Sequence, residues 1–253
     1  MSRARSEHDH HAVERIVPGT DVFVWEAGSH RSRYRFALRH LHRPGLVLDA
    51  ACGSGYGAEM LSTCADQVVG VDISAEALEY AGRYRCPGRT EFVWADVERM
   101  PFSDATFDYV VSFETIEHVK EPGRLLTELR RILKPGGAVI ISAPTDPEEH
   151  LSNRYHLHSF TPESLSLLVG TFFERVTTFA QLHVPLTRVH PMNLVRFLAR
   201  TSGHWTRFLA PRASEYPIVP YRNGEARLIE SVVMIASGPR ILIAPEKVRH
   251  VAV

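Results

Sequence analysis

Short apolar runs alternate with helix-like stretches from about residue 45 onward. Five of these runs have the length and apolar content of buried strands: Gly45–Ala50, Gln67–Asp72, Glu91–Asp96, Phe107–Phe113 and Ala138–Ala143. Strands that alternate with helices are typical of βαβ units, which build a parallel sheet with helices on both faces. The pattern therefore predicts a doubly wound α/β fold.

Two segments carry the marks of helices. The segment before the fifth run places its apolar residues on one helical face, at Leu125, Leu126, Leu129, Ile132 and Leu133. Lys134-Pro135-Gly136-Gly137 follows and predicts the end of that helix and a turn into the next strand. Thr161-Pro162-Glu163 predicts the start of a second helix, because it sets a capping hydroxyl before a proline at the first helical position.

The last third of the chain contains two further strand-like runs, Phe173–Ala180 and Ser231–Ser237. The intervening segment 181–224 is too long for a hairpin, and its only acid is Glu215. Its basic residues are Arg188, Arg196, Arg200, Arg207, Arg212 and Arg222. We expect a basic, partly helical insertion that covers the acceptor site, with a homodimer face or a solvated helix as alternatives.

The chain has 253 residues with equal numbers of basic and acidic side chains, 29 of each. This balance argues against a protein that binds nucleic acid over its whole surface. The start of the chain, Met1 to Arg15, is polar and lacks the apolar core of a signal peptide, so we expect a disordered lead-in over 1–20 followed by one domain over 21–253. No apolar run approaches the roughly 20 residues that span a bilayer. The three cysteines are too scattered for a disulfide framework, so a cytoplasmic location is expected.

The strongest local motif follows the first predicted strand, from Asp49 to Gly57. Its glycines are spaced G-x-G-x-G, whereas dinucleotide-binding loops use G-x-G-x-x-G. Asp49 stands four residues ahead of Gly53. A carboxylate there would repel a diphosphate, but it suits a ligand that carries an ammonium group.

Two more acids end the second and third predicted strands. Asp72 is positioned to accept hydrogen bonds from ribose hydroxyls. Asp96 is positioned to accept from an adenine amine, while the Val97 amide reaches a ring nitrogen. Because ligands of open α/β sheets bind at the carboxyl ends of the strands, we expect these acids to line one crevice.

In combination these motifs resemble the class I S-adenosylmethionine-dependent methyltransferases, especially the ubiquinone-type (type 11) group. The matching residues lie in 47–57, 71–74, 95–97, 107–119 and 133–137. The resemblance implies a Rossmann-like sheet of seven strands with the last antiparallel, and the insertion between strands six and seven. It implies S-adenosylmethionine as cofactor, held by Arg33, Asp49, Ala51, Gly53, Gly55, Asp72, Ile73, Asp96, Val97 and Phe113.

Arg33 enters this set through the segment His30–Ala37, which resembles the helix covering the cofactor in related enzymes. The resemblance makes Arg33 the partner of the methionine carboxylate. The alternative is an arginine on an exposed helix face.

The segment after the fourth predicted strand is expected to hold the catalytic residues, Glu117 and His118. Methyl transfer to a hydroxyl requires a proton acceptor, and histidine has a near-neutral pKa.

The spacing Glu114-x-x-Glu117-His118 also suits a divalent cation, because the three side chains share one side of a helical turn. It resembles the metal site of plant-type small-RNA 2′-O-methyltransferases, which use a later histidine that would correspond to His156. The predicted centre is Mg²⁺ or Mn²⁺ bound by Glu114, Glu117, His118 and His156. The alternative is a metal-free turn in which these side chains cap the helix.

The residues indicate less about the methyl acceptor. The opening Glu14–Thr20 and the Arg33-Tyr34 pair look similar to bacterial methyltransferases of polysaccharide synthesis. We therefore expect O-methylation of a sugar, glycan or other small hydroxylated molecule. Alternatives are a quinone, phenol, lipid or RNA 2′-hydroxyl acceptor, a nicotinamide-dependent oxidoreductase, or a non-catalytic cofactor sensor.

Overall fold

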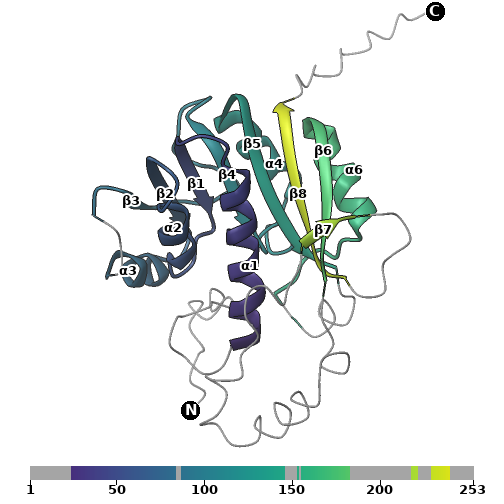
Figure 1. Cartoon of the computed structure of the whole chain (residues 1–253), viewed down its shortest axis with the longest axis horizontal. Helices are drawn as coiled ribbons and strands as arrows, with labels where there is room; N and C mark the ends of the chain where they lie inside the picture. Colours follow the sequence, from purple (N-terminus) through teal and green to yellow (C-terminus); the bar gives the residue numbers. More distant parts are fainter. Residues whose placement is uncertain are drawn as a thin grey trace, which may run out of the picture.

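The computed structural model describes residues 24–83, 87–145, 153, 155–182, 218–221 and 229–239. These residues form one sheet of eight strands in the order β3-β2-β1-β4-β5-β8-β6-β7 (Figure 1). The strands are β1 (Leu46–Ala50), β2 (Gln67–Asp72), β3 (Thr90–Trp94), β4 (Phe107–Phe113), β5 (Leu133–Pro144), β6 (Phe173–Leu182), β7 (Ile218–Pro220) and β8 (Ile229–Pro239).

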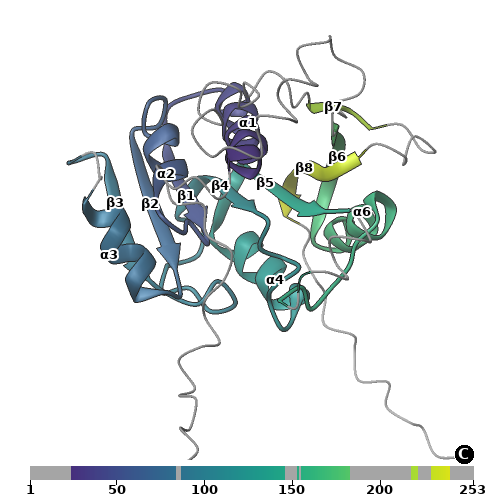
Figure 2. The same cartoon turned by 90° about the horizontal axis from the view of Figure 1, so that it is seen from below.

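Helices cover both faces of the sheet (Figure 2). The described helices are α1 (Val24–His40), α2 (Tyr56–Leu61), α3 (Ala75–Arg83), α4 (Pro122–Ile132) and α6 (Pro162–Phe172). Buried residues of α1 and α2 share one apolar cluster with the sheet, and buried residues of α4 and α6 share the other. No described helix is both long and apolar enough to cross a membrane.

The apolar face predicted around residues 125–133 is the buried face of α4. Leu125, Leu126, Leu129 and Ile132 are fully buried against the sheet. α6 begins as predicted, since the Thr161 side chain accepts from the Ser164 amide and the Ser164 hydroxyl accepts from the Thr161 amide. These two helices cover the same face of the sheet.

The strand pairing confirms the predicted fold class and refines it. β1 pairs in parallel with both β2 and β4, while β8 runs antiparallel between β5 and β6. The antiparallel last strand is therefore present. The prediction of seven strands was one short, because β7 adds a short edge strand against β6 within the predicted insertion. The lead-in 1–20 and the arginines of segment 181–224 lie outside the described residues.

The strand order reverses at β1, which lies between β2 and β4. Open α/β sheets bind ligands at such a switch point, outside the carboxyl ends of the strands. The loop after β1 and the turn after β4 both emerge there, and they carry the residues of the candidate site.

Candidate active site

The loop after β1 turns through left-handed backbone conformations. Gly53 has φ 53° and Gly55 has φ 79°. A Cβ on Gly53 would meet nothing within 4 Å, so this glycine borders open space. A Cβ on Gly55 would lie 2.6 Å from the Cβ of Ala81, so this glycine instead lets α3 pack closely against the loop. The two predicted cofactor glycines thus have different physical roles.

A cavity of about 100 Å³ opens beside this loop. It is lined by His30, Tyr34, Ala51, Cys52, Gly53, Ser54, Tyr56, Asp72, Phe113 and Glu114. Four predicted cofactor residues are in this lining, namely Ala51, Gly53, Asp72 and Phe113. The structure brings together at one cavity residues from α1, the β1 loop, α2, β2 and β4.

Asp72 ties the loop to the end of β2. One of its carboxylate oxygens accepts from the Gly53 amide at 2.9 Å, and the other accepts from the Ser74 amide at 2.8 Å. Each oxygen of an ionised carboxylate offers two lone pairs. Asp72 can therefore hold the loop in place and still accept from a ligand hydroxyl.

Asp49 is buried, with 1% exposure, and lies behind the cavity lining. Burial raises the pKa of its carboxyl to about 7; the nearby Asp72 carboxylate acts in the same direction and the Tyr34 hydrogen bond acts against them. The Asp49 carboxyl is therefore partly protonated and partly ionised near neutral pH. A cationic ligand nearby would favour its ionised form.

Three further predicted cofactor residues, Ile73, Asp96 and Val97, lie outside the cavity lining. Asp96 is exposed and accepts from the Glu98 amide at 2.9 Å. Ile73 is 44% exposed, and the Trp94 indole donates to its carbonyl at 2.7 Å. Val97 is buried.

Arg33 differs from both sequence-based expectations, because it is neither exposed nor at the cavity wall. Its side chain is 2% exposed and lies 3.4 Å from the Glu114 carboxylate. It also donates to the Gln181 side chain at 2.8 Å and to the Ser231 hydroxyl at 3.0 Å. Its partners come from strands late in the chain, so helix position alone did not predict them.

Glu114 is likewise placed differently from the prediction. Its carboxylate accepts from the Ser142 hydroxyl at 2.6 Å and pairs with Arg33, and its backbone has φ 47°. This left-handed turn directs Glu114 to β5 and β8, away from Glu117 and His118. The structure therefore does not bring Glu114 together with the other three predicted metal ligands.

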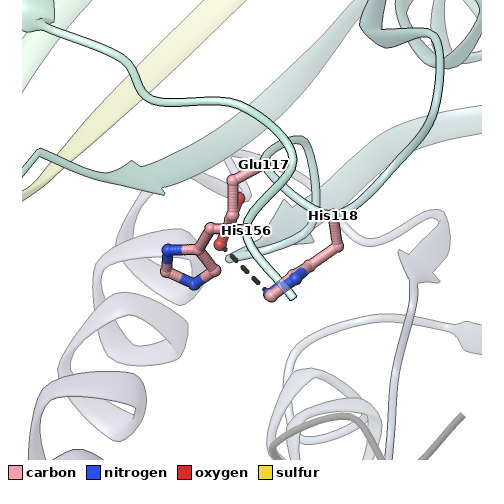
Figure 3. Close-up of side chains that lie close together, drawn as sticks. All are labelled: Glu117, His118 and His156. Atoms are coloured by element: carbon pink, nitrogen blue, oxygen red, sulfur yellow. Dashed lines mark ion pairs between the residues drawn. The ribbon is translucent and has the colours of Figure 1, made fainter. Parts of the chain in front are cut away.

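The other three members do meet (Figure 3). Glu117, His118 and His156 each offer one ligand atom, and these atoms lie within 4.8 Å of one another. The His118 Nε2 atom lies 3.6 Å from a Glu117 carboxylate oxygen, and the two imidazole rings are 4.8 Å apart. Glu117 is 1% exposed. We call these residues the Glu–His–His cluster.

Hydrogen bonds to backbone groups join the two segments that carry the Glu–His–His cluster, around residues 117–118 and 155–158. The amides of Leu157 and His158 donate to the Glu117 carbonyl at 2.8 and 3.1 Å. The His118 Nδ1 atom lies 3.0 Å from the Tyr155 carbonyl. A carbonyl only accepts, so Nδ1 must carry the proton of a neutral imidazole. The unprotonated Nε2 atom of His118 is therefore the one that lies 3.6 Å from the Glu117 carboxylate.

His156 is held by a different group. The Tyr155 amide donates to the Asn153 side-chain oxygen at 3.0 Å, which fixes the orientation of that amide. The Asn153 nitrogen then donates to the His156 Nε2 atom at 2.9 Å. One ring nitrogen of His156 is therefore engaged as an acceptor.

Five lining residues were not predicted as site residues, namely His30, Tyr34, Cys52, Ser54 and Tyr56. The Tyr56 hydroxyl oxygen is buried and has no hydrogen-bond partner among the described residues. Tyr56 lies directly after Gly55 and begins α2, which is where a loop of this kind meets its ligand. That position was the available sequence clue.

Comparison with known proteins finds a family model that matches residues 48–141, which include the loop after β1. The family is described as a methyltransferase domain. A probable S-adenosylmethionine-dependent methyltransferase of Mycobacterium tuberculosis is 32% identical over 182 residues, which cover 69% of this chain and 65% of that protein. Another, from Mycolicibacterium smegmatis, is 30% identical over 176 residues, 67% of each chain. The chain thus spans about 65% of the length of the first of these relatives.

Among solved structures, a possible histamine N-methyltransferase of Thermotoga maritima superposes with a TM-score of 0.62. The match covers 85% of this chain and 91% of that chain at 20% identity. At that identity the likeness supports the fold alone.

Proposed function

The chain belongs to the S-adenosylmethionine-dependent methyltransferases, and from that premise we propose that its cavity binds S-adenosylmethionine and serves methyl transfer to a hydroxyl group. The cofactor, when bound, supplies a methyl group activated on a sulfonium. The observation that carries the proposal is the cavity where Gly53 leaves open space beside the Asp72 carboxylate. The protein must bind the cofactor, align the acceptor and take up its proton.

The cavity residues fit such a ligand on their own chemistry. Asp72 retains acceptor capacity for ribose hydroxyls, and a Cβ would meet nothing at Gly53, so the backbone can approach a ligand closely. Asp49 supplies a buried carboxylate for an ammonium group, and the Tyr56 hydroxyl is a buried donor without a partner among the described residues. An adenosyl amino acid carries all the complementary groups.

His118 is the proposed proton acceptor. Its Nδ1 atom is held by the Tyr155 carbonyl, so its Nε2 atom is the basic one. The Glu117 carboxylate, 3.6 Å from Nε2, stabilises the imidazolium that forms when His118 takes a proton. Proton transfer of this kind contributes roughly 10²–10⁴-fold to a rate.

The proposed acceptor is a hydroxyl of a sugar, glycan or other small molecule. A base next to the methyl-transfer site is needed for a hydroxyl, which must lose a proton as the new bond forms. Segment 181–224, with its arginines, is the proposed cover of the acceptor, and Arg side chains bind phosphate or carboxylate substituents well. A nucleic-acid acceptor is disfavoured by the balanced charge of the chain.

A second candidate for the role of the Glu–His–His cluster is the binding of a divalent cation. One carboxylate and two imidazoles suit a first-row transition ion such as Mn²⁺ better than Mg²⁺, which prefers oxygen ligands. Ligation by His156 Nε2 would require the Asn153 amide to release it. The cation would lower the pKa of a bound acceptor hydroxyl.

The test is transfer of labelled methyl from the cofactor to a panel of sugars, glycosides and phenols. His118→Gln should lower turnover at least about 100-fold without changing S-adenosylhomocysteine affinity. His42→Gln, on an exposed residue, is the matched control. If His118→Gln turns over as fast as the wild type, the base is wrongly assigned.

Exhaustive chelation separates the two candidates. If chelated wild-type protein keeps full activity and His118→Gln remains defective, His118 acts as the proton acceptor without a metal. If chelation abolishes activity and Mn²⁺ restores it, a divalent cation at the Glu–His–His cluster is required for turnover.

A further inference from the structure

The cavity lining includes His30 of α1 and Tyr56 of α2. The Tyr56 hydroxyl oxygen is buried and finds no hydrogen-bond partner within the described ranges. A buried hydroxyl without a partner loses its hydrogen bonds to water without compensation, so a water, an ion or a ligand group that bonds to it would be stabilising. Burial and the nearby Arg33 guanidinium lower the pKa of His30, so its imidazole is neutral at neutral pH.

The cavity is otherwise rich in acids. Asp72 and Glu114 line it, and Asp49 lies behind it. The guanidinium of Arg33 is already paired with Glu114 and donates to Gln181 and Ser231. A ligand carboxylate in this cavity therefore needs donors other than Arg33, and the side chains of His30 and Tyr56 supply an N–H and an O–H.

We propose that His30 and Tyr56 bind the carboxylate at the amino-acid end of the cofactor. This inference rests on the proposed function and replaces Arg33 in the role that the sequence suggested for it. Two neutral donors suit the task because the cofactor brings its own ammonium and sulfonium charges to the cavity acids. Arg33 keeps a positioning role, since it holds Glu114 at the cavity edge.

Two ligands that differ at the amino-acid end provide the test. S-adenosylhomocysteine carries the carboxylate, whereas 5′-methylthioadenosine lacks the whole amino-acid end. Titration calorimetry of the full chain with each ligand therefore isolates contacts to that end. A hydrogen bond to a charged group is among the stronger ones, so losing it should weaken affinity about tenfold or more.

Tyr56→Phe is the decisive variant, because it removes only the unpartnered hydroxyl. Its melting temperature should match or exceed that of the wild type, since no described hydrogen bond is lost. Affinity for S-adenosylhomocysteine should fall about tenfold, while affinity for 5′-methylthioadenosine changes less than about twofold. Tyr109→Phe, on a β4 residue outside the cavity lining, should change neither. His30→Leu should repeat the Tyr56→Phe pattern.

Three outcomes would overturn the inference. Unchanged S-adenosylhomocysteine affinity in Tyr56→Phe removes the hydroxyl from the site. Equal losses for both ligands indicate a contact to the adenosine part or a general disturbance of the cavity. Failure of the wild-type chain to bind S-adenosylhomocysteine would overturn the proposed function itself, and is thereby distinguished from the other two.

Discussion

The Tyr34 hydroxyl donates to both carboxylate oxygens of Asp49, at 3.1 and 3.2 Å. This bifurcated bond ties α1 to β1 just before the cavity loop. The Tyr34 ring also packs edge-on against Phe113 and Tyr56, with ring centroids 5.1 and 5.4 Å away. One side chain thus connects α1, β1, α2 and the end of β4, and several properties of the protein should depend on it.

Gly57 leaves the room that Tyr34 occupies. A Cβ at Gly57 would lie 2.0 Å from the ring carbon that bears the Tyr34 hydroxyl, so Gly57→Ala must displace the ring. We expect Gly57→Ala to lower the free energy of unfolding by about 1–3 kcal/mol, the usual cost of overpacking. Denaturant titration measures this free energy.

Gly170 is the matched control, because it also lies in a helix but a Cβ there meets nothing within 4 Å. Gly170→Ala should leave the stability unchanged or raise it by up to about 1 kcal/mol. Similar effects of the two substitutions would show that Tyr34 does not fill the space at Gly57.

Asp49 should make stability depend on pH in an unusual direction. Its pKa is raised from 3.8 to about 7 in the folded protein, so the folded state holds this proton more tightly than the unfolded state does. The free energy of unfolding should therefore fall as pH rises from about 4 to about 7 and then level off. Asp49→Asn cannot titrate, so this part of the decline should be absent from that variant. Parallel curves for the two proteins would show an ordinary Asp49 pKa.

The same carboxyl should link cofactor binding to pH. If the cofactor ammonium is held by ionised Asp49, binding must expel the proton that the free protein carries below about pH 7. Affinity for S-adenosylhomocysteine should rise about tenfold between about pH 6 and about pH 8. Calorimetry in two buffers of different ionisation enthalpy would detect the released proton. In Asp49→Asn the affinity should be lower and independent of pH over this range.

The fold was predictable because its pattern is local. The apolar runs gave β1, β2 and β4 nearly residue by residue, since strands buried on both faces are continuously apolar. The prediction for β5 was too short, because the strand begins at Leu133 and includes Lys134 to Gly137, which were predicted as a turn. β7 was not predicted, because three residues, Ile218 to Pro220, form a strand only by pairing with the edge of β6. That pairing is a tertiary effect without a local pattern.

The candidate site could be predicted from the sequence for those residues that directly follow or end a parallel strand. Asp72 and Gly53 meet because parallel strands end at one edge, and topology alone brings them together. Arg33 and Glu114 were misplaced because their partners, Ser231 and Ser142, lie far along the chain. Tyr56 was missed since nothing in sequence distinguishes a hydroxyl with a partner from one without.

The cofactor site is tested by binding of S-adenosylhomocysteine to the full chain, measured by titration calorimetry. We expect saturable binding at one site and no comparable binding of NAD⁺. Asp72→Ala should weaken the affinity by about 1.5–3 kcal/mol, the value of a hydrogen bond to a charged group. Asp66→Ala, on an exposed acid just before β2, should bind as the wild type does. Unchanged affinity in Asp72→Ala, or binding of NAD⁺ in place of S-adenosylhomocysteine, would overturn the proposed cofactor site.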